Sequence, residues 1–403
     1  MHTEIRTLAS QPEIAALLTH WQGAGAAQVL AETIYLQQIP APTFEERSRA
    51  EYVRRRFSEI GLADIEIDAL KNVYGRTPGV KSQPALMVSA HLDTVFPLDT
   101  DLTINTDEAA GRVVGPGIGD NSAGVGALIQ LAEALAQRMI RPTVDIWWVA
   151  TVGEEGLGDL RGMRRACDYL SGRFNTAIIL EGIGLGRIYH AGMGVRRLKI
   201  IIRGSGGHSW LHAGRPSAIH ELLHLGAAII EGVRPPKRPR SSLNIGLISG
   251  GTSINTLAPI AECFIDLRSV DADVLTRMEA EVRDHVLRSD DQSDLTASIE
   301  VVGDRPSASL PLEHPLVRAS QSILRYVNIG PGSREIGSTD ANIPLSLGIP
   351  AVCVGVTTGG GAHTTDEFID IPPLGTGMRQ LTLLSLLAAK HCVDWGRWGA
   401  ASR

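Results

Sequence analysis

The feature that most constrains this fold is a set of short apolar runs separated by helical patterns. Helical periodicity is clearest over 121–139, around RGMRRACDYL and near 375–393. The apolar runs between these patterns have the length of buried strands: ALMVSA (85–90), VDIWWVA (144–150), TAIILEG (176–182) and IPAVCVGV (349–356). Strands that alternate with helices in this way predict an α/β fold with a mainly parallel sheet.

The pattern changes after residue 193. An alternating strand (GVRRLKIIIRG), an amphipathic helix (SAIHELLHLGAAIIEGV), two strands, a second helix near 272–288 and a last strand near ASIEVVG follow in turn. This order predicts a small α+β layer of the ferredoxin-like type. The α/β pattern returns after Arg305. We therefore expect one domain formed by residues 1–193 and 305–403, with a second domain inserted at 194–304.

Composition bounds the possible functions. The chain has 403 residues, 43% of them hydrophobic and 20% charged, as expected of a globular protein of about two domains. A net charge of −6 gives no basic footprint for nucleic acid. The start MHTEIRTLASQPE lacks the apolar core of a signal peptide, and no apolar run has the length of a membrane span. We expect a cytoplasmic protein without nucleic-acid or membrane partners, and its four widely separated cysteines fit reduced thiols.

Polar side chains follow the predicted strands at the point where each strand ends. Because the carboxyl ends of parallel strands meet at one edge of a sheet, these groups can converge. Two histidines with several carboxylates and no cysteine match a site for zinc, cobalt or manganese. Two divalent ions about 3.5 to 4 Å apart fit so many ligands better than one ion does. The residues concerned are His91, Asp93, Asp120, Glu154, Glu155, Glu181 and His363.

Six motifs in a fixed order carry a resemblance to a known family. They are SAHLDTV, GPGIGDNSAG, TVGEEGLG, ILEG, GSGGHSW and GAHTTDE. In this order the chain resembles the M20 family of metallopeptidases and amidohydrolases, among its peptidase T-like, acetylornithine deacetylase and carboxypeptidase G2-like relatives. The resemblance covers nearly the whole chain. It implies a metal-binding catalytic domain and an inserted lid and dimerisation domain.

The resemblance also implies how the metal ligands are shared. Asp120 would bridge two ions, with His91 and Glu181 on one ion and Glu155 and His363 on the other. The ions would be zinc, or else cobalt or manganese.

The residues beside these ligands receive roles from the same resemblance. Asp93 would orient His91 by accepting its other ring proton. Glu154 would be the general base, and the peptide bond between Asp120 and Asn121 would be cis. Neighbouring side chains of an extended segment point to opposite sides, so Glu155 could bind metal while Glu154 takes a proton from an activated water. Cations would then neutralise two adjacent carboxylates that are costly at the end of a buried strand.

The inserted domain would contribute further residues. The resemblance implies that His208, in the glycine-rich turn RGSGGHSW, donates to the tetrahedral oxyanion in the partner subunit of a homodimer. Asn255 and Arg268 would contact the substrate, with the arginine pairing with a carboxylate. Arg268 could instead pair with Asp266 or Glu262 on the sheet surface.

Two classes of function remain open. The first is a metalloenzyme that hydrolyses an amide bond in a short peptide or an N-acyl amino acid, and the second is a catalytically silent relative that binds peptides or proteins. The five ligand positions and Glu154 are all present, which favours the enzyme. Glu181 stands where family aminopeptidases and dipeptidases tend to have aspartate. This difference favours substrates with a free carboxylate, such as acyl amino acids or carboxypeptidase substrates.

Overall fold

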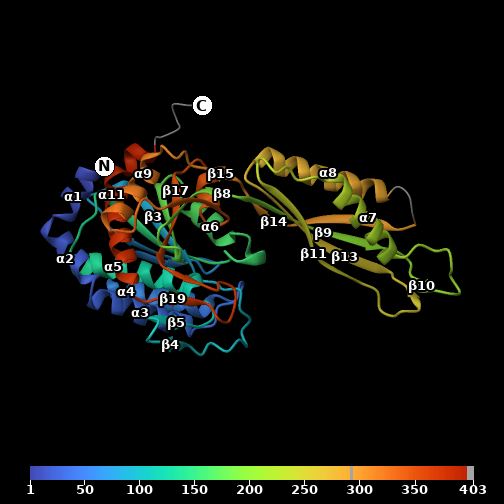
Figure 1. Ribbon diagram of the computed structural model, residues 1–403, viewed down its shortest axis with the longest axis horizontal. Helices are drawn as coiled ribbons and strands as arrows, with labels where there is room; N and C mark the ends of the chain where they lie inside the picture. Colours follow the sequence, from blue (N-terminus) through green and yellow to red (C-terminus); the bar gives the residue numbers. More distant parts are fainter. Residues whose placement is uncertain (291–293, 397–403) are drawn as a thin grey trace. The chain divides into compact units, whose positions relative to one another are not determined.

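The computed structural model describes residues 1–290 and 294–396, and the chain divides into two compact units (Figure 1). Unit 1 comprises Met1–Ala191 together with the chain from Ser309 onward. Unit 2 comprises Gly192–Ala308. Within the described part of the chain, no helix has both the length and the apolar character needed to cross a membrane.

Unit 1 is built on a nine-stranded sheet with a parallel centre. The strands run in the order β1-β2-β6-β3-β7-β17-β8-β15, and β16 pairs with β8. The central strands β6 (Val144–Thr151), β3 (Lys81–His91), β7 (Phe174–Ile183) and β17 (Ala351–Thr357) pair in parallel. Every residue of β6 and β17 is buried, which is why both read as continuous apolar runs. The predicted α/β fold with a mainly parallel sheet is therefore confirmed.

Shorter strands complete unit 1. On either side of the parallel centre, β2 pairs antiparallel with β6 and β8 pairs antiparallel with β17. A second, four-stranded sheet has the order β18-β19-β5-β4. The bounds are β1 (Ala63–Ile67), β2 (Val73–Thr77), β4 (Asn105–Asp107), β5 (Arg112–Val114), β8 (Arg187–Gly192), β15 (Ala308–Ser309), β16 (Ser333–Gly337), β18 (Gly359–Gly360) and β19 (Phe368–Asp370).

Helices cover the large sheet of unit 1. Helices α5 and α11 pack against β3 and β7, α4 packs against β1 and β2, and α6 contacts β6. The expected helices at 121–139 and 375–393 correspond to α5 and α11. The bounds are α1 (His2–Ala9), α2 (Pro12–His20), α3 (Ala24–Gln37), α4 (Arg47–Ile60), η1 (Ile118–Ala123), α5 (Gly124–Gln137), η2 (Gly156–Gly158), α6 (Arg161–Tyr169), α9 (Pro315–Tyr326), α10 (Asn342–Ser346) and α11 (Leu374–Gly396).

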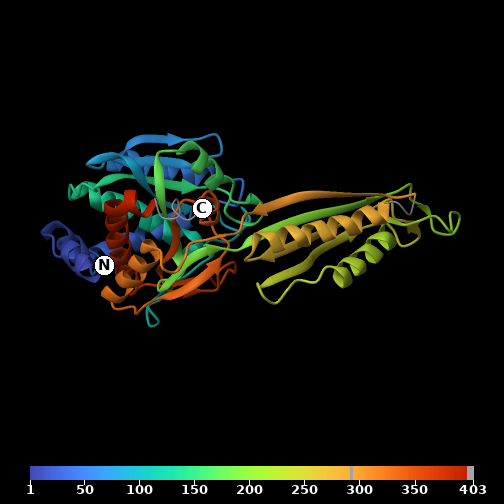
Figure 2. The ribbon, with the colours of Figure 1, turned by 90° about the horizontal axis from the view of Figure 1, so that it is seen from above.

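Unit 2 is a four-stranded antiparallel sheet with two helices on one face. The order is β11-β13-β9-β14, and α7 and α8 both contact β9 and β13 and lie side by side (Figure 2). Alternate residues of β13 are buried, because one face meets the helices and the other does not. This is the predicted strand, helix, two strands, helix, strand order. The bounds are β9 (Gly194–Arg203), β10 (Gly207–His208), α7 (Ala218–Gly232), β11 (Ser241–Gly250), β12 (Thr256–Leu257), β13 (Ile260–Ser269), α8 (Ala272–Asp290) and β14 (Thr296–Arg305).

Candidate metal centre

The parallel centre of unit 1 places the predicted residues at one edge of the sheet. His91 is the last residue of β3, and the pair Glu154 and Glu155 follows the end of β6 at Thr151. Glu181 lies near the end of β7. The carboxyl ends of β3 and β6 are in register, since His91 pairs with Thr151. The convergence expected of parallel strands is therefore present.

Asp120 and His363 reach this edge from loops. Asp120 lies in η1, the irregular turn that leads into α5, and His363 follows the short strand β18. The peptide bond between Asp120 and Asn121 is cis, as the resemblance predicts. The side chain of Asn121 brackets Glu181: its amide nitrogen donates to the carbonyl of Leu180 (2.8 Å), and its oxygen accepts the N–H of Gly182 (2.9 Å). The turn η1 thus carries Asp120 and, through Asn121, is hydrogen-bonded to the strand that carries Glu181.

Two groups of possible ligand atoms meet at Asp120. His91, Asp120 and Glu181 form one group, and Asp120, Glu155 and His363 form the other, with the ligand atoms of each group within 4.8 Å of one another. Asp120 Oδ1 lies 3.1 Å from His91 Nε2, and its Oδ2 lies 3.1 Å from His363 Nε2. Each carboxylate oxygen therefore faces a different histidine, which is the arrangement that a bridging carboxylate requires.

The remaining contacts define which side chains belong to each group. His91 Nε2 lies 3.6 Å from Glu181 Oε2, and His363 Nε2 lies 3.1 Å from Glu155 Oε1. Glu154 and Glu155 also form a group with His91. The two glutamates therefore both reach the site, rather than facing away from each other as strict alternation would require.

Burial and charge perturb the protonation of the cluster. Burial opposes a proton on His91, but hydrogen bonds to Asp120 and Asp93 outweigh it and raise the pKa of His91. Hydrogen bonds to Asp120 and Glu155 raise the pKa of His363 to about 10. Burial raises the pKa of Glu181 to about 7. The carboxylates that favour a proton on each histidine would equally favour a divalent cation, because metal binding displaces protons from its ligands.

The donor set fits hard or borderline divalent ions. Imidazole nitrogens and carboxylate oxygens suit zinc, cobalt and manganese, and a carboxylate shared between two three-residue groups suits two ions. His91, Asp120 and Glu181 would hold one ion, and Asp120, Glu155 and His363 the other.

Asp93 lies beside His91 and also has further partners. Its carboxylate is fully buried and accepts the main-chain N–H groups of Glu154 (3.0 Å) and Glu155 (2.9 Å), and the hydroxyl of Thr43 (2.9 Å). His91 Nδ1 lies 3.0 Å from the main-chain carbonyl of Asp93 and 3.6 Å from Asp93 Oδ1. The ring of His91 thus faces both the carbonyl and the carboxylate of Asp93, and the carboxylate also holds the glutamate pair.

Glu367, to which the sequence analysis assigns no role, binds the main chain of the turn that carries Asp120. It is fully buried and accepts the main-chain N–H groups of Asp120 (2.6 Å), Gly119 (2.7 Å) and Gly117 (3.3 Å). Burial raises the pKa of Glu367 to about 7. The only sequence signal was its place four residues after His363 in the GAHTTDE motif. Glu367 fixes the turn that carries Asp120.

The predicted residues of unit 2 lie on two parts of that unit. His208 is exposed in β10, where its Nδ1 accepts the N–H of Trp210 (3.2 Å). Asn255 lies beside it, because the carbonyl of Asn255 accepts the N–H of Ser209 (3.0 Å). Arg268, on β13, donates to Asp266 Oδ1 (2.6 Å), which is one of the two pairings that the sequence left open.

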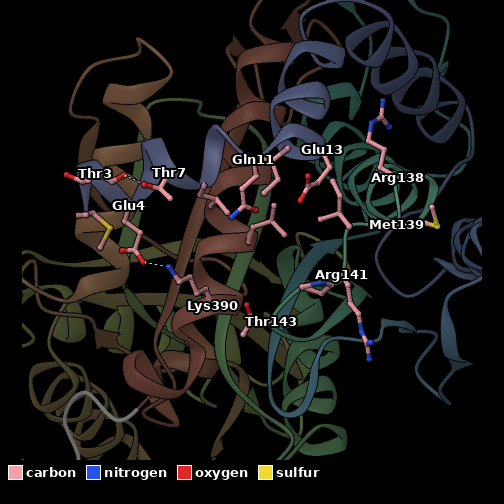
Figure 3. A pocket seen from close by; sticks show the side chains of 16 residues that line it. Thr3, Glu4, Thr7, Gln11, Glu13, Arg138, Met139, Arg141, Thr143 and Lys390 are labelled. Atoms are coloured by element: carbon pink, nitrogen blue, oxygen red, sulfur yellow. Dashed lines mark hydrogen bonds and ion pairs between the residues drawn. The ribbon is translucent and has the colours of Figure 1, made fainter.

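A cavity of about 950 Å³ in unit 1 involves other residues (Figure 3). Side chains from α1, α2, α11 and the segment between α5 and β6 line it, and none of the predicted site residues is among them in the described part of the chain. Lys390 reaches Glu4 there at 2.7 Å. The cavity is therefore distinct from the candidate metal centre.

Comparison with known proteins identifies the family. The model of peptidase family M20/M25/M40 matches residues 87–386. The chain belongs to this family. It is thus a member of a family of peptidases, and the predicted resemblance is confirmed.

Individual relatives share fold and part of the sequence. A probable carboxypeptidase from Aspergillus flavus is 30% identical over 230 residues, which are 51% of this chain and 50% of that protein. The chain thus spans about half the length of this curated relative. The aminopeptidase PepT from Bacillus cereus has a similar structure, with a TM-score of 0.72 and 21% identity over 90% of this chain and 98% of PepT.

A third relative binds metal. The YXEP protein of Bacillus subtilis, a dinuclear metal binding peptidase from the M20 family, has a TM-score of 0.65 and 17% identity over 91% of this chain and 99% of its own. At these identities the two solved structures show a common fold.

Proposed function

We propose that the protein hydrolyses an amide bond in a small substrate, either a short peptide or an N-acyl amino acid. The observation that carries the proposal is Asp120, whose two carboxylate oxygens each lie 3.1 Å from a different histidine. Membership of the M20/M25/M40 peptidase family and the dinuclear metal binding of the YXEP protein also support this proposal.

Two divalent ions bound there, most simply zinc, would act as Lewis acids that acidify a water molecule and polarise the amide carbonyl. Glu154 is the general base in this proposal. Its carboxylate belongs to one group with His91 and Glu155, next to the positions that would hold the ions. Glu154 is buried in the site, and it would take a proton from the reacting water and pass it to the departing amine.

The substrate class rests on two observations. Glu181 replaces the aspartate that aminopeptidases and dipeptidases of the family tend to have, which favours a substrate with a free carboxylate. A probable carboxypeptidase is among the relatives of the chain. Arg268 and Asn255 of unit 2 would bind the substrate, with Arg268 exchanging Asp266 for the substrate carboxylate.

Unit 2 would act as a lid and as the dimerisation domain of a homodimer, with His208 donating to the oxyanion in the partner subunit. His208 is exposed and follows two glycines of positive φ, Gly206 and Gly207. Because its Nδ1 accepts the N–H of Trp210, Nε2 would be the ring nitrogen that donates to the oxyanion. His208→Ala would then keep both ions and lose about 10² to 10³ in turnover. Mixed dimers with Glu154→Gln chains would recover part of the activity, because one site would contain an intact Glu154 and an intact partner His208. Failure to recover activity in proven mixed dimers would argue against donation across the interface.

The test of the hydrolase is a panel of dipeptides and N-acyl amino acids offered to zinc- or cobalt-loaded protein. We expect hydrolysis of at least one class, and we expect Glu154→Gln to keep the metals while losing about 10² to 10⁴ in turnover. A Glu154→Gln variant with normal turnover would remove Glu154 from its role. Binding of peptides without any hydrolysis would instead favour the catalytically silent relative.

A further inference from the structure

Four successive main-chain N–H groups after β6 donate to side chains rather than to the backbone. The strand ends at Thr151, and the segment from Val152 to Glu155 carries the proposed base. Buried N–H groups need acceptors, and here three residues far away in the sequence provide them. The bonds join Val152 to Asn72 Oδ1 (3.0 Å), Gly153 to Glu46 Oε1 (3.1 Å), Glu154 to Asp93 Oδ1 (3.0 Å) and Glu155 to Asp93 Oδ2 (2.9 Å).

Glu46 stands apart among these acceptors because it is itself held by a cation. Its side chain is 1% exposed, and Arg161 Nη2 lies 2.7 Å from Oε1 and 3.0 Å from Oε2. The guanidinium of Arg161 also lies over the ring of Phe44, 4.3 Å from its centroid. The N–H of Phe44 donates to Glu46 Oε1 (2.9 Å). The Glu46 carboxylate is therefore held by Arg161 and by the N–H of Phe44, all within unit 1.

The same ion pair shapes the backbone at Gly153. This residue has a φ of +65°, a backbone conformation that residues other than glycine rarely adopt. A Cβ at this position would meet Arg161 Cγ at 2.9 Å. Glu46 thus binds the N–H of Gly153 while Arg161 occupies the space beside its Cα. Together they fix the turn immediately before Glu154.

We propose that Glu46, held by Arg161, is a positioning residue for the Glu154 carboxylate. The inference rests on the proposed function, in which Glu154 is the general base. A base must lie within hydrogen-bond reach of the proton it takes, and a displacement of about 1 Å can cost about 10² in rate. Glu46 contacts none of the proposed metal ligands through its carboxylate, so it acts through the main chain at Gly153.

The variants that test this role are Glu46→Gln and Glu46→Ala. Glutamine keeps an oxygen for the N–H of Gly153 but loses the charge that holds Arg161, so we expect kcat to fall about 10-fold. Alanine also removes the acceptor, and we expect a fall of about 10². In both variants KM and the bound metal should stay within about twofold of the wild type. A matched control is Glu32→Gln, since Glu32 is also buried and paired with an arginine, Arg56 Nε at 3.2 Å, but bonds none of these N–H groups. Its kcat should be unchanged.

A double-mutant cycle with Glu154→Gln separates positioning from general damage. If Glu46 acts through Glu154, then Glu46→Gln should lower the residual kcat of the Glu154→Gln protein by less than about twofold. A further 10-fold loss in that background, or normal kcat in the Glu46→Gln protein alone, would overturn the inference. A Glu154→Gln protein with normal turnover would instead remove Glu154 from its role as base in the proposed function, so the two failures are distinguishable. Glu46→Gln keeps the size of the side chain, so the cycle can be read even if Glu46→Ala does not fold.

Discussion

Removing the Glu367 carboxylate should weaken metal binding although Glu367 is not a proposed ligand. Three buried N–H groups donate to it, from Gly117, Gly119 and Asp120. Glu367→Ala leaves these donors without their acceptor. A buried unsatisfied donor costs about 1 to 3 kcal/mol, so the free energy of unfolding of the metal-free protein should fall by about 3 kcal/mol or more.

The expected loss of metal affinity follows from the place of Asp120 in the site. Residues that support the ligands of a metal site typically contribute about 10- to 100-fold in metal affinity. Glu367 supports the main chain of Asp120, the only carboxylate among the described residues that belongs to both of the proposed ligand groups. Glu367→Ala should therefore bind zinc about 10- to 100-fold more weakly. Glu367→Gln should lose less, because one amide oxygen can still accept the two shorter bonds, from Gly119 and Asp120.

The assay is zinc competition against a chromophoric chelator, alongside urea unfolding of the metal-free proteins. We expect the order wild type, Glu367→Gln, Glu367→Ala in both affinity and stability. Wild-type zinc affinity in the Glu367→Ala protein, together with a clear loss of stability, would refute the reasoning. It would mean that the turn of Asp120 does not need Glu367 to present its ligand.

Three further predictions concern stability and metal dependence. Burial lowers the pKa of His314 to about 4, so the unfolded chain binds more protons between pH 6.5 and 4. When the pH falls from 7 to 5, the free energy of unfolding of the wild type should therefore decrease by about 1 to 2 kcal/mol more than that of His314→Asn. Asparagine keeps an acceptor for the N–H of Leu316, and urea titrations at both pH values provide the measurement. Gly377→Ala should destabilise unit 1 by about 3 kcal/mol or more, because its Cβ would lie 1.6 Å from the carbonyl oxygen of Val356. Gly226 lies in α7, and an added Cβ there would meet only Ile245 Cδ1 of β11, at 3.7 Å, so Gly226→Ala should stabilise unit 2 by about 0.5 to 1 kcal/mol. Equal melting shifts for the two variants would contradict this. Exhaustive chelation should abolish hydrolysis and zinc should restore it, whereas full activity after chelation would exclude the metal mechanism.

The fold could be predicted from the sequence where local pattern and burial agree. Strands β6 and β17 are buried along their whole length, and the alternation of β13 follows its single covered face. His91 and Glu155 could be expected to meet because parallel strands share an edge.

The supporting residues could not be predicted, because their role depends on backbone geometry. Glu46, Asn121 and Glu367 bind main-chain groups of distant segments, and in the sequence each is an ordinary polar residue in a loop or turn. The same limit applies to Asp93. Its position two residues after His91 indicated a partnership with that ring, but not that its carboxylate would also accept the main-chain N–H groups of Glu154 and Glu155. Arg268 had two possible partners, and only the three-dimensional structure shows it with Asp266.

The most direct test of the account is anomalous diffraction from crystals of the zinc-loaded protein, with data collected on both sides of the zinc absorption edge. The account predicts two anomalous peaks about 3.5 to 4 Å apart, one beside His91 and Glu181 and the other beside Glu155 and His363, with Asp120 between them. A single peak at full zinc loading, or peaks at positions that Asp120 does not reach, would contradict the two-ion centre.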